Sequence, residues 1–128
     1  MKDKRLTIII EKPVNEVFDF TVNPENTPKW IEGIVLEKIN ETPPRLGTIY
    51  RNKSKDGSWN EYKMTAFEAN KMFELTRISG NYHVRYTFTP THEGHCNFEY
   101  YEWVDEGELD DTVSQQVLDT LKNVMEKE

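Results

Sequence analysis

The chain has 128 residues and a formal net charge of −7, with 16 Lys and Arg against 23 Asp and Glu. This acidic balance opposes a surface that follows nucleic-acid phosphates, so no nucleic-acid partner is expected. The length is typical of one domain with one core, here residues 1–128. No stretch approaches the ~20 apolar residues that cross a bilayer. The one cysteine, Cys96, excludes an internal disulfide, so a cytoplasmic protein without a membrane span is predicted.

The first third of the chain predicts one strand and two short helices. Residues 6–10 are apolar and mostly β-branched, which is typical of a strand. Pro13 suits the first position of a helix, and apolar residues then recur at helical spacing to residue 21. Asn23-Pro24 and Thr27-Pro28 each resemble a helix cap followed by a proline, so a second short helix should carry Trp30.

The middle of the chain predicts an antiparallel sheet. Apolar and polar residues alternate in runs separated by turn signals such as Asp56-Gly57 and Ser79-Gly80-Asn81. The expected strands cover approximately residues 34–39, 48–53, 62–66, 73–77, 82–89 and 96–103. Short turns between consecutive strands indicate antiparallel pairing. From about Asp110 onward, apolar residues fall at helical spacing and predict an amphipathic helix that lies on the sheet.

Two charged residues share a strand face with apolar ones. Arg77 lies two and four residues after Leu75 and Phe73, so on a strand the three share a face. Glu102 has the same relation to Tyr100 and Phe98. A buried guanidinium or carboxylate needs a charged or hydrogen-bonding partner. One interpretation places both groups at strand ends in water, or pairs them with each other. The other makes them the polar end of a pocket with apolar walls, the usual construction of a small-molecule site.

No motif assigns a catalytic residue, a metal or a cofactor. A nucleophile elbow, a phosphate-binding P-loop and a Gly-rich dinucleotide loop do not occur in the sequence. His92 and His95 are three apart in a predicted turn, whereas the H-E-x-x-H zinc motif needs them four apart on a helix. Cys96 lies on an alternating strand, where a small buried side chain is its expected role. Catalytic residues therefore stay unassigned, and neither metal nor cofactor is expected.

The three tryptophans predict different surroundings. Trp30 follows a proline-rich turn, where it either fastens the short helices to the sheet or gates the entrance of a cavity. Trp59 and Trp103 are expected to face outward, as packing or as a self-association surface. A homodimer through these indoles is one hypothesis.

The order of elements resembles the START/polyketide cyclase-like helix-grip superfamily, SRPBCC, in its polyketide cyclase/dehydrase-like branch. The resemblance rests on I-E-K-P-V-N-E-V-F-D-F over residues 10–20, followed by N-P-E at 23–25 and P-K-W at 28–30. Leu46-Gly47-Thr48, Thr65-Ala66-Phe67-Glu68 and Phe88-Thr89-Pro90 also occur where that pattern expects them. The resemblance implies an α+β helix-grip fold: a seven-stranded curved antiparallel sheet around a long C-terminal helix, with two short helices after the first strand and an internal cavity.

Known relatives with this fold include carriers, enzymes and chaperone activators, so the resemblance leaves several functions open. Our leading hypothesis is a ligand-binding domain that takes a small hydrophobic or amphipathic molecule, lipid-like or polyketide-like. The alternatives are a cyclase or dehydratase that uses the same cavity, and a protein-interaction module. The expected ligand-binding residues are Trp30, Tyr62, Met64, Leu75, Arg77, Tyr86, Phe98, Tyr100, Glu102, Val117 and Leu121.

Overall fold

The computed structural model describes residues 2–109 and 113–127. Seven strands form one antiparallel sheet in the order β1-β7-β6-β5-β4-β3-β2. The strands are β1 (Lys2–Ile10), β2 (Ile34–Ile39), β3 (Ile49–Ser54), β4 (Trp59–Glu68), β5 (Met72–Arg77), β6 (Tyr82–Pro90) and β7 (Cys96–Val104). The helices are α1 (Val14–Val22), the 3₁₀ turn η1 (Pro24–Asn26), α2 (Thr27–Trp30) and α3 (Gln115–Glu126).

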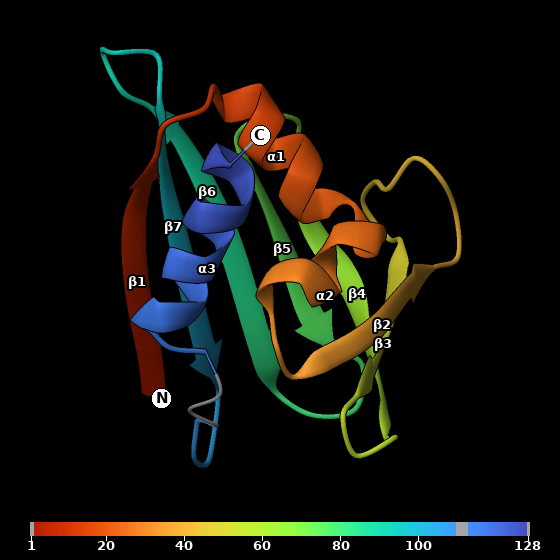
Figure 1. Ribbon diagram of the computed structural model, residues 1–128. Coiled ribbons are helices and arrows are strands. Elements are labelled where there is room, and N and C mark those ends of the chain that lie inside the picture. Colours follow the sequence, from red (N-terminus) through yellow and green to blue (C-terminus); the bar gives the residue numbers. More distant parts are fainter. Residues whose placement is uncertain (1, 110–112, 128) are drawn as a thin grey trace.

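The predicted fold class is confirmed: α1 and α2 follow β1, and α3 closes over the sheet (Figure 1). Neighbouring strands from β3 to β7 are joined by connections of three to five residues, whereas nine residues, 40–48, join β2 to β3. At Gly57 the chain turns with φ +89°, and at Asn70 with φ +62°; glycine and asparagine tolerate these left-handed conformations best. The first strand is longer than expected because its pairing with β7 begins at Lys2, opposite Val104. The last helix begins at Gln115, and residues 110–112, where we expected its start, lie outside the described residues.

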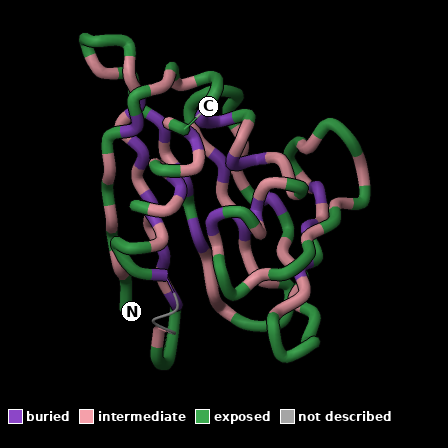
Figure 2. Tube along the Cα trace, in the orientation of Figure 1, coloured by how far each residue is buried: buried purple, intermediate pink, exposed green. Residues whose placement is uncertain are grey.

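The core lies between the inner face of the sheet and the three helices (Figure 2). Its centre is aromatic: the Phe18 ring contacts the Phe73 and Phe88 rings with centroids 5.8 and 5.2 Å apart. Tyr86 pairs across the sheet with Tyr100, and Phe88 with Phe98, so their rings share the inner face. These contacts explain how a chain with only 36% hydrophobic residues fills a core.

The helices cover the sheet unevenly. α3 packs on β1, and α1 packs against β6 and β7. On the other half of the sheet, α2 contacts β2 and α3, but it has only four residues. A helix rises about 1.5 Å per residue, so α2 spans roughly 6 Å. The strands β2 to β5 therefore have much less helical cover than β1, β7 and β6.

Candidate ligand cavity

A cavity of about 500 Å³ lies over the thinly covered strands β2 to β5 and extends to β6 and to Tyr100 of β7. This volume is in the range of sites for small organic molecules. Its lining includes Leu75, Val84, Val113 and Val117 on the apolar side. Exposed lining residues, Glu32 among them, mark where it reaches the surface. The remaining lining residues are Thr21, Thr27, Ile31, Gly33, Ile34, Glu37, Tyr50, Asn52, Ser54, Ser58, Asn60, Tyr62, Phe73, Arg77, Tyr82, Tyr86 and Tyr100.

A row of polar side chains crosses the floor of the cavity from β2 to β4. Glu37 pairs in register with Asn52, and Asn52 with Asn60, so the three side chains lie on adjacent strands. Thr27 of α2 donates a hydrogen bond to Glu37 Oε1 at 2.5 Å, and Asn52 Nδ2 donates to Oε2 at 3.3 Å. Burial raises the pKa of Glu37 to about 7, while these two hydrogen bonds oppose the rise. Glu37 is therefore a carboxyl group that exchanges its proton near neutral pH.

Arg77 extends the polar row onto β5. Its Nη2 donates a hydrogen bond to Asn60 Oδ1 at 2.6 Å, and its Nε is buried without a hydrogen-bond partner among the described residues. Tyr62, the register partner of Arg77, also lines the cavity. The guanidinium thus enters the cavity wall beside a neutral amide and a phenol.

A second polar cluster lies on β6 and β7. Glu102 Oε1 accepts hydrogen bonds from the Tyr82 and Tyr100 hydroxyls, both at 2.7 Å. Its Oε2 lies 3.3 Å from Lys4 Nζ, and the Glu102 side chain is fully buried. Burial raises the pKa values of Tyr82 and Tyr100 well above the usual range, so both hydroxyls stay protonated and donate. This cluster holds the buried carboxylate in place with a cation and two donors.

Six of the eleven predicted site residues line the cavity: Tyr62, Leu75, Arg77, Tyr86, Tyr100 and Val117. The other five are Trp30, Met64, Phe98, Glu102 and Leu121, and they lie in the core outside the lining. Trp30 is 2% exposed, and its ring packs edge-on to the Tyr86 and Phe98 rings. It fastens α2 to the sheet, one of the two roles considered for it. Arg77 bonds to Asn60, and Glu102 is ion-paired with Lys4. The two charged residues therefore have separate protein partners and do not pair with each other.

Sequence reasoning missed most of the polar lining, above all Glu37, Asn52, Asn60 and Tyr82. Glu37 follows Val35 in parity, yet Val35 is 49% exposed because the pairing of β2 with β3 shifts register between Ile34 and Leu36. Alternation alone therefore could not locate Glu37. The in-phase asparagines on two strands joined by the Asp56-Gly57 hairpin were a signal, since amides on the same row of adjacent strands face the same side.

A second hollow, about 590 Å³, lies between α1 and the segment before β3. Its walls include Phe18, Val22, Ile39 and Phe67. The two acids that line it, Asp19 and Glu25, are exposed, so no desolvated charge points into it from the described lining. We therefore take the first cavity as the candidate site.

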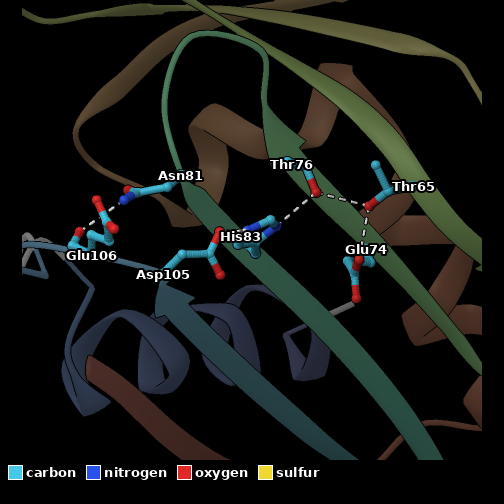
Figure 3. Close-up of polar contacts among 7 residues, drawn as sticks. All are labelled: Thr65, Glu74, Thr76, Asn81, His83, Asp105 and Glu106. Carbon is cyan, nitrogen blue, oxygen red and sulfur yellow. Dashed lines mark hydrogen bonds and ion pairs between the residues drawn. The ribbon is translucent and has the colours of Figure 1, made fainter. Parts of the chain in front are cut away.

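A chain of polar contacts crosses the outer face of the sheet (Figure 3). Asp105 Oδ2 lies 2.9 Å from His83 Nε2, and His83 Nδ1 lies 2.9 Å from Thr76 Oγ1. Thr76 also contacts Thr65 at 2.9 Å. This order of acid, imidazole and hydroxyl is that of a nucleophile relay. However, these residues do not line either cavity, and Thr76 Oγ1 already has two partners. The chain of contacts serves to join β4, β5, β6 and the end of β7.

The tryptophans expected to face outward lie at the surface of the sheet. Trp59 is 42% exposed, with the Arg51 guanidinium 5.0 Å from its ring centroid. Trp103 stacks on His83 and on Tyr101, with centroids 4.8 and 5.1 Å apart. The self-association hypothesis for these side chains stays a prediction.

In residues 2–109 and 113–127, no helix is long and apolar enough to cross a membrane. The same residues contain no group of three or more His, Cys, Asp or Glu side chains arranged to hold a metal ion. Cys96 is fully buried, and burial raises the pKa of its thiol to about 11.

Solved structures share this architecture over nearly their whole lengths. The protein XoxI from Bacillus cereus matches with a TM-score of 0.77 and 14% identity, over 97% of this chain and 95% of that one. Protein MLL2253 from Mesorhizobium loti matches with a TM-score of 0.74 and 16% identity, over 98% of each chain. The solution structure of the Aha1 dimer from Colwellia psychrerythraea matches with a TM-score of 0.68 and 13% identity, over 99% and 94%. At these identities the matches establish the helix-grip fold alone.

The sequence itself establishes the family. The sequence model of the family described as "Polyketide cyclase / dehydrase and lipid transport" matches residues 1–127. The chain therefore belongs to the polyketide cyclase/dehydrase and lipid transport family, as its opening motif and element order predicted. No curated protein sequence matches the chain at a significant level.

Proposed function

We propose that residues 1–128 form a ligand-binding domain that takes a small amphipathic molecule into the cavity between the sheet, α2 and α3. The observation that carries this proposal is the 500 Å³ cavity, whose walls are apolar on one side and hydrogen-bonding on the other. Membership of a family that includes lipid transport proteins agrees with a hydrophobic ligand. Affinity would come from burial of the apolar part, at about 25 cal/mol per Å² of surface.

The apolar wall sets what part of the ligand is buried. Leu75 and Val84 lie opposite each other on β5 and β6, and Val117 faces them from α3. The rings of Tyr62, Tyr86 and Tyr100 add aromatic surface to the same wall. This arrangement favours a flat or flexible carbon skeleton, with the polar end of the ligand toward β2 to β5.

The test is binding of N-phenyl-1-naphthylamine, a neutral apolar fluorophore. The wild-type protein should enhance its fluorescence in a saturable way. Val117→Trp and Ile34→Trp each place an indole in the lining, from the helix and from the opening respectively, and both should abolish the enhancement. Native mass spectrometry of the protein from its own host should show the ligand that occupies the same cavity.

The matched control is Gln116→Trp, which adds the same indole at an exposed position of α3 outside the lining. It should bind the fluorophore as the wild type does. Thermal denaturation shows whether each variant is folded. If a folded Val117→Trp or Ile34→Trp variant enhanced the fluorescence of N-phenyl-1-naphthylamine as much as wild type does, the fluorophore would bind elsewhere. That result would contradict the proposal.

A second candidate function is a cyclase or dehydratase that uses this cavity. The observation in its favour is Glu37, a carboxyl group in the lining whose pKa of about 7 suits proton transfer near neutral pH. Turnover of a polyketide-like substrate should be lost in Glu37→Gln, with binding retained. A carrier would keep its ligand unchanged in the wild type as well as in the variant.

A further inference from the structure

The cavity contains a guanidinium without a carboxylate partner. Among the described residues, no Asp or Glu lies within 4.0 Å of the Arg77 nitrogens, and the hydrogen bond to Asn60 goes to a neutral amide. An arginine presents five N–H donors, and this bond uses one. A partly buried guanidinium gains most from a planar oxyanion that accepts two of its donors.

The nearby acids are each engaged with other groups. Glu37 accepts from Thr27 and Asn52, and Glu102 is held by Lys4 and two tyrosine hydroxyls outside the lining. Glu32 lies at the exposed rim, where Lys55 Nζ is 3.1 Å from its Oε1. The positive charge of Arg77 is therefore left for a group that enters the cavity.

The same acids limit how much negative charge a ligand can bring. Glu37 and Arg77 line one cavity, so a doubly charged phosphate beside Arg77 would also face the Glu37 carboxyl. In a desolvated site such like-charge repulsion costs more than it does in water. A ligand with a single negative charge neutralises Arg77 and leaves no excess negative charge beside Glu37. The unionised Glu37 carboxyl can in addition donate a hydrogen bond to an oxyanion.

We propose that the cavity selects a monoanionic carboxylic acid with an apolar body, held by its carboxylate on Arg77 and Asn60. This inference rests on the proposed binding function and names its ligand class. The apolar body lies between β5, β6 and α3, against Leu75, Val84 and Val117. Asn60 Nδ2, which contacts Ser54 Oγ at 3.3 Å, supplies a further donor to the carboxylate.

The test compares two ligands of equal chain length, decanoate and decan-1-ol, as competitors of N-phenyl-1-naphthylamine at about pH 6. Wild type should bind decanoate at least about tenfold more tightly than decan-1-ol. Arg77→Met keeps the apolar stem and removes the charge. It should weaken decanoate by at least about tenfold and leave decan-1-ol within about threefold.

Arg77→Lys and Arg51→Met sharpen the test. Lysine keeps the charge without the planar fork, so it should retain part of the preference for decanoate. Arg51 lies on the outer face, ion-paired with Glu61 at 3.2 Å, and its replacement should change neither affinity. If the fluorophore binds but wild type does not prefer decanoate, or Arg77→Met weakens both competitors equally, the inference is wrong while the binding function stands. If the fluorophore does not bind, the proposed function itself fails.

Discussion

The two halves of the sheet carry the same kind of strands but end in different environments. Over β1, β7 and β6, the twelve-residue helix α3 and the helix α1 cover most of the sheet, and Ile10, Phe98, Leu118 and Leu121 have no exposed surface. Over β2 to β5, the cover is the four-residue α2, and polar side chains line an open volume. The cavity is therefore a consequence of helix length: a short helix cannot fill the groove that a long one fills.

Trp30 gives the strongest way to break this comparison, because it belongs to the short helix yet packs on the filled half. Trp30→Ala should lower the free energy of unfolding by about 3–5 kcal/mol, since it removes a buried indole in contact with Tyr86 and Phe98. Chemical denaturation followed by circular dichroism measures the change.

Trp30→Phe is the matched control, since it keeps a ring and removes only part of the volume. It should cost clearly less than the alanine variant. Trp59→Ala removes the same side chain from a site that is 42% exposed and should stay within about 1 kcal/mol of wild type. A small effect of Trp30→Ala would show that α2 is held by other contacts.

Glu37 tests the half of the sheet that lines the cavity, because its protonation makes the stability of the protein depend on pH. The carboxyl has an ordinary pKa of 4.5, and burial raises it to about 7 in the folded protein. The folded state therefore binds the proton more strongly than the unfolded chain. The contribution of Glu37 to stability is full below pH 4.5, falls by about 1.4 kcal/mol per pH unit up to pH 7, and is flat above.

Glu37→Gln should accordingly be more stable than wild type at pH 8, by up to about 3 kcal/mol, with the difference largely gone at pH 5. Denaturant titrations at both pH values measure it. Glu61→Gln, on the outer face of strand β4, is the control and should show no comparable pH-dependent gain. A pH-independent difference for Glu37→Gln would mean that the carboxyl is hydrated and titrates normally.

Tyr82 lies at the boundary of the two halves, since it lines the cavity and bonds to the buried Glu102. Tyr82→Phe removes the hydroxyl that donates to Glu102 Oε1 at 2.7 Å and should cost about 1–2 kcal/mol. Tyr101→Phe removes an outer-face hydroxyl that donates to the exposed Asp3 at 2.9 Å, and this should cost under about 0.5 kcal/mol. Equal costs would show that Glu102 does not depend on the cavity wall.

Most of the fold could be predicted from the sequence, because strand alternation, turn residues and the amphipathic last helix are local signals. Asp56-Gly57 fixed a hairpin, and the parity of Phe73 and Leu75 placed Arg77 on the inner face. The start of the last helix was harder to predict, since the acidic residues before it show no apolar periodicity that would mark where the helix begins. Its described start is Gln115, preceded by Ser114.

The candidate site was predictable only in part, for a physical reason. Alternation tells which residues face inward but not whether a helix fills the space above them. Phe98 and Tyr100 share a face of β7, yet Phe98 is sealed in the core and Tyr100 lines the cavity. Because the pairing of β2 with β3 shifts register between Ile34 and Leu36, sequence alternation could not predict that Glu37 faces inward. Depth and helix cover come from the packed structure.

The smallest expected effect is a pH dependence of decanoate affinity, which depends on both Glu37 and Arg77. Decanoate stays ionised above about pH 6, because carboxyl groups have ordinary pKa values near 4. As Glu37 loses its proton around pH 7, a second negative charge appears in the cavity that holds Arg77. The affinity of wild type for decanoate should therefore fall by about 3–10-fold between pH 6 and pH 8, whereas that for decan-1-ol should not change.

The other titratable groups around Glu37 do not produce this profile. Tyr50 and Tyr86 lie in the lining with pKa values raised by burial, so both phenols stay neutral over this pH range. Glu32 lies at the rim beside Lys55. In Glu37→Gln, decanoate affinity should thus be flat with pH and equal to the wild-type value at pH 6. A fall that persists in this variant would assign the effect to another group and separate Glu37 from the carboxylate that we place on Arg77.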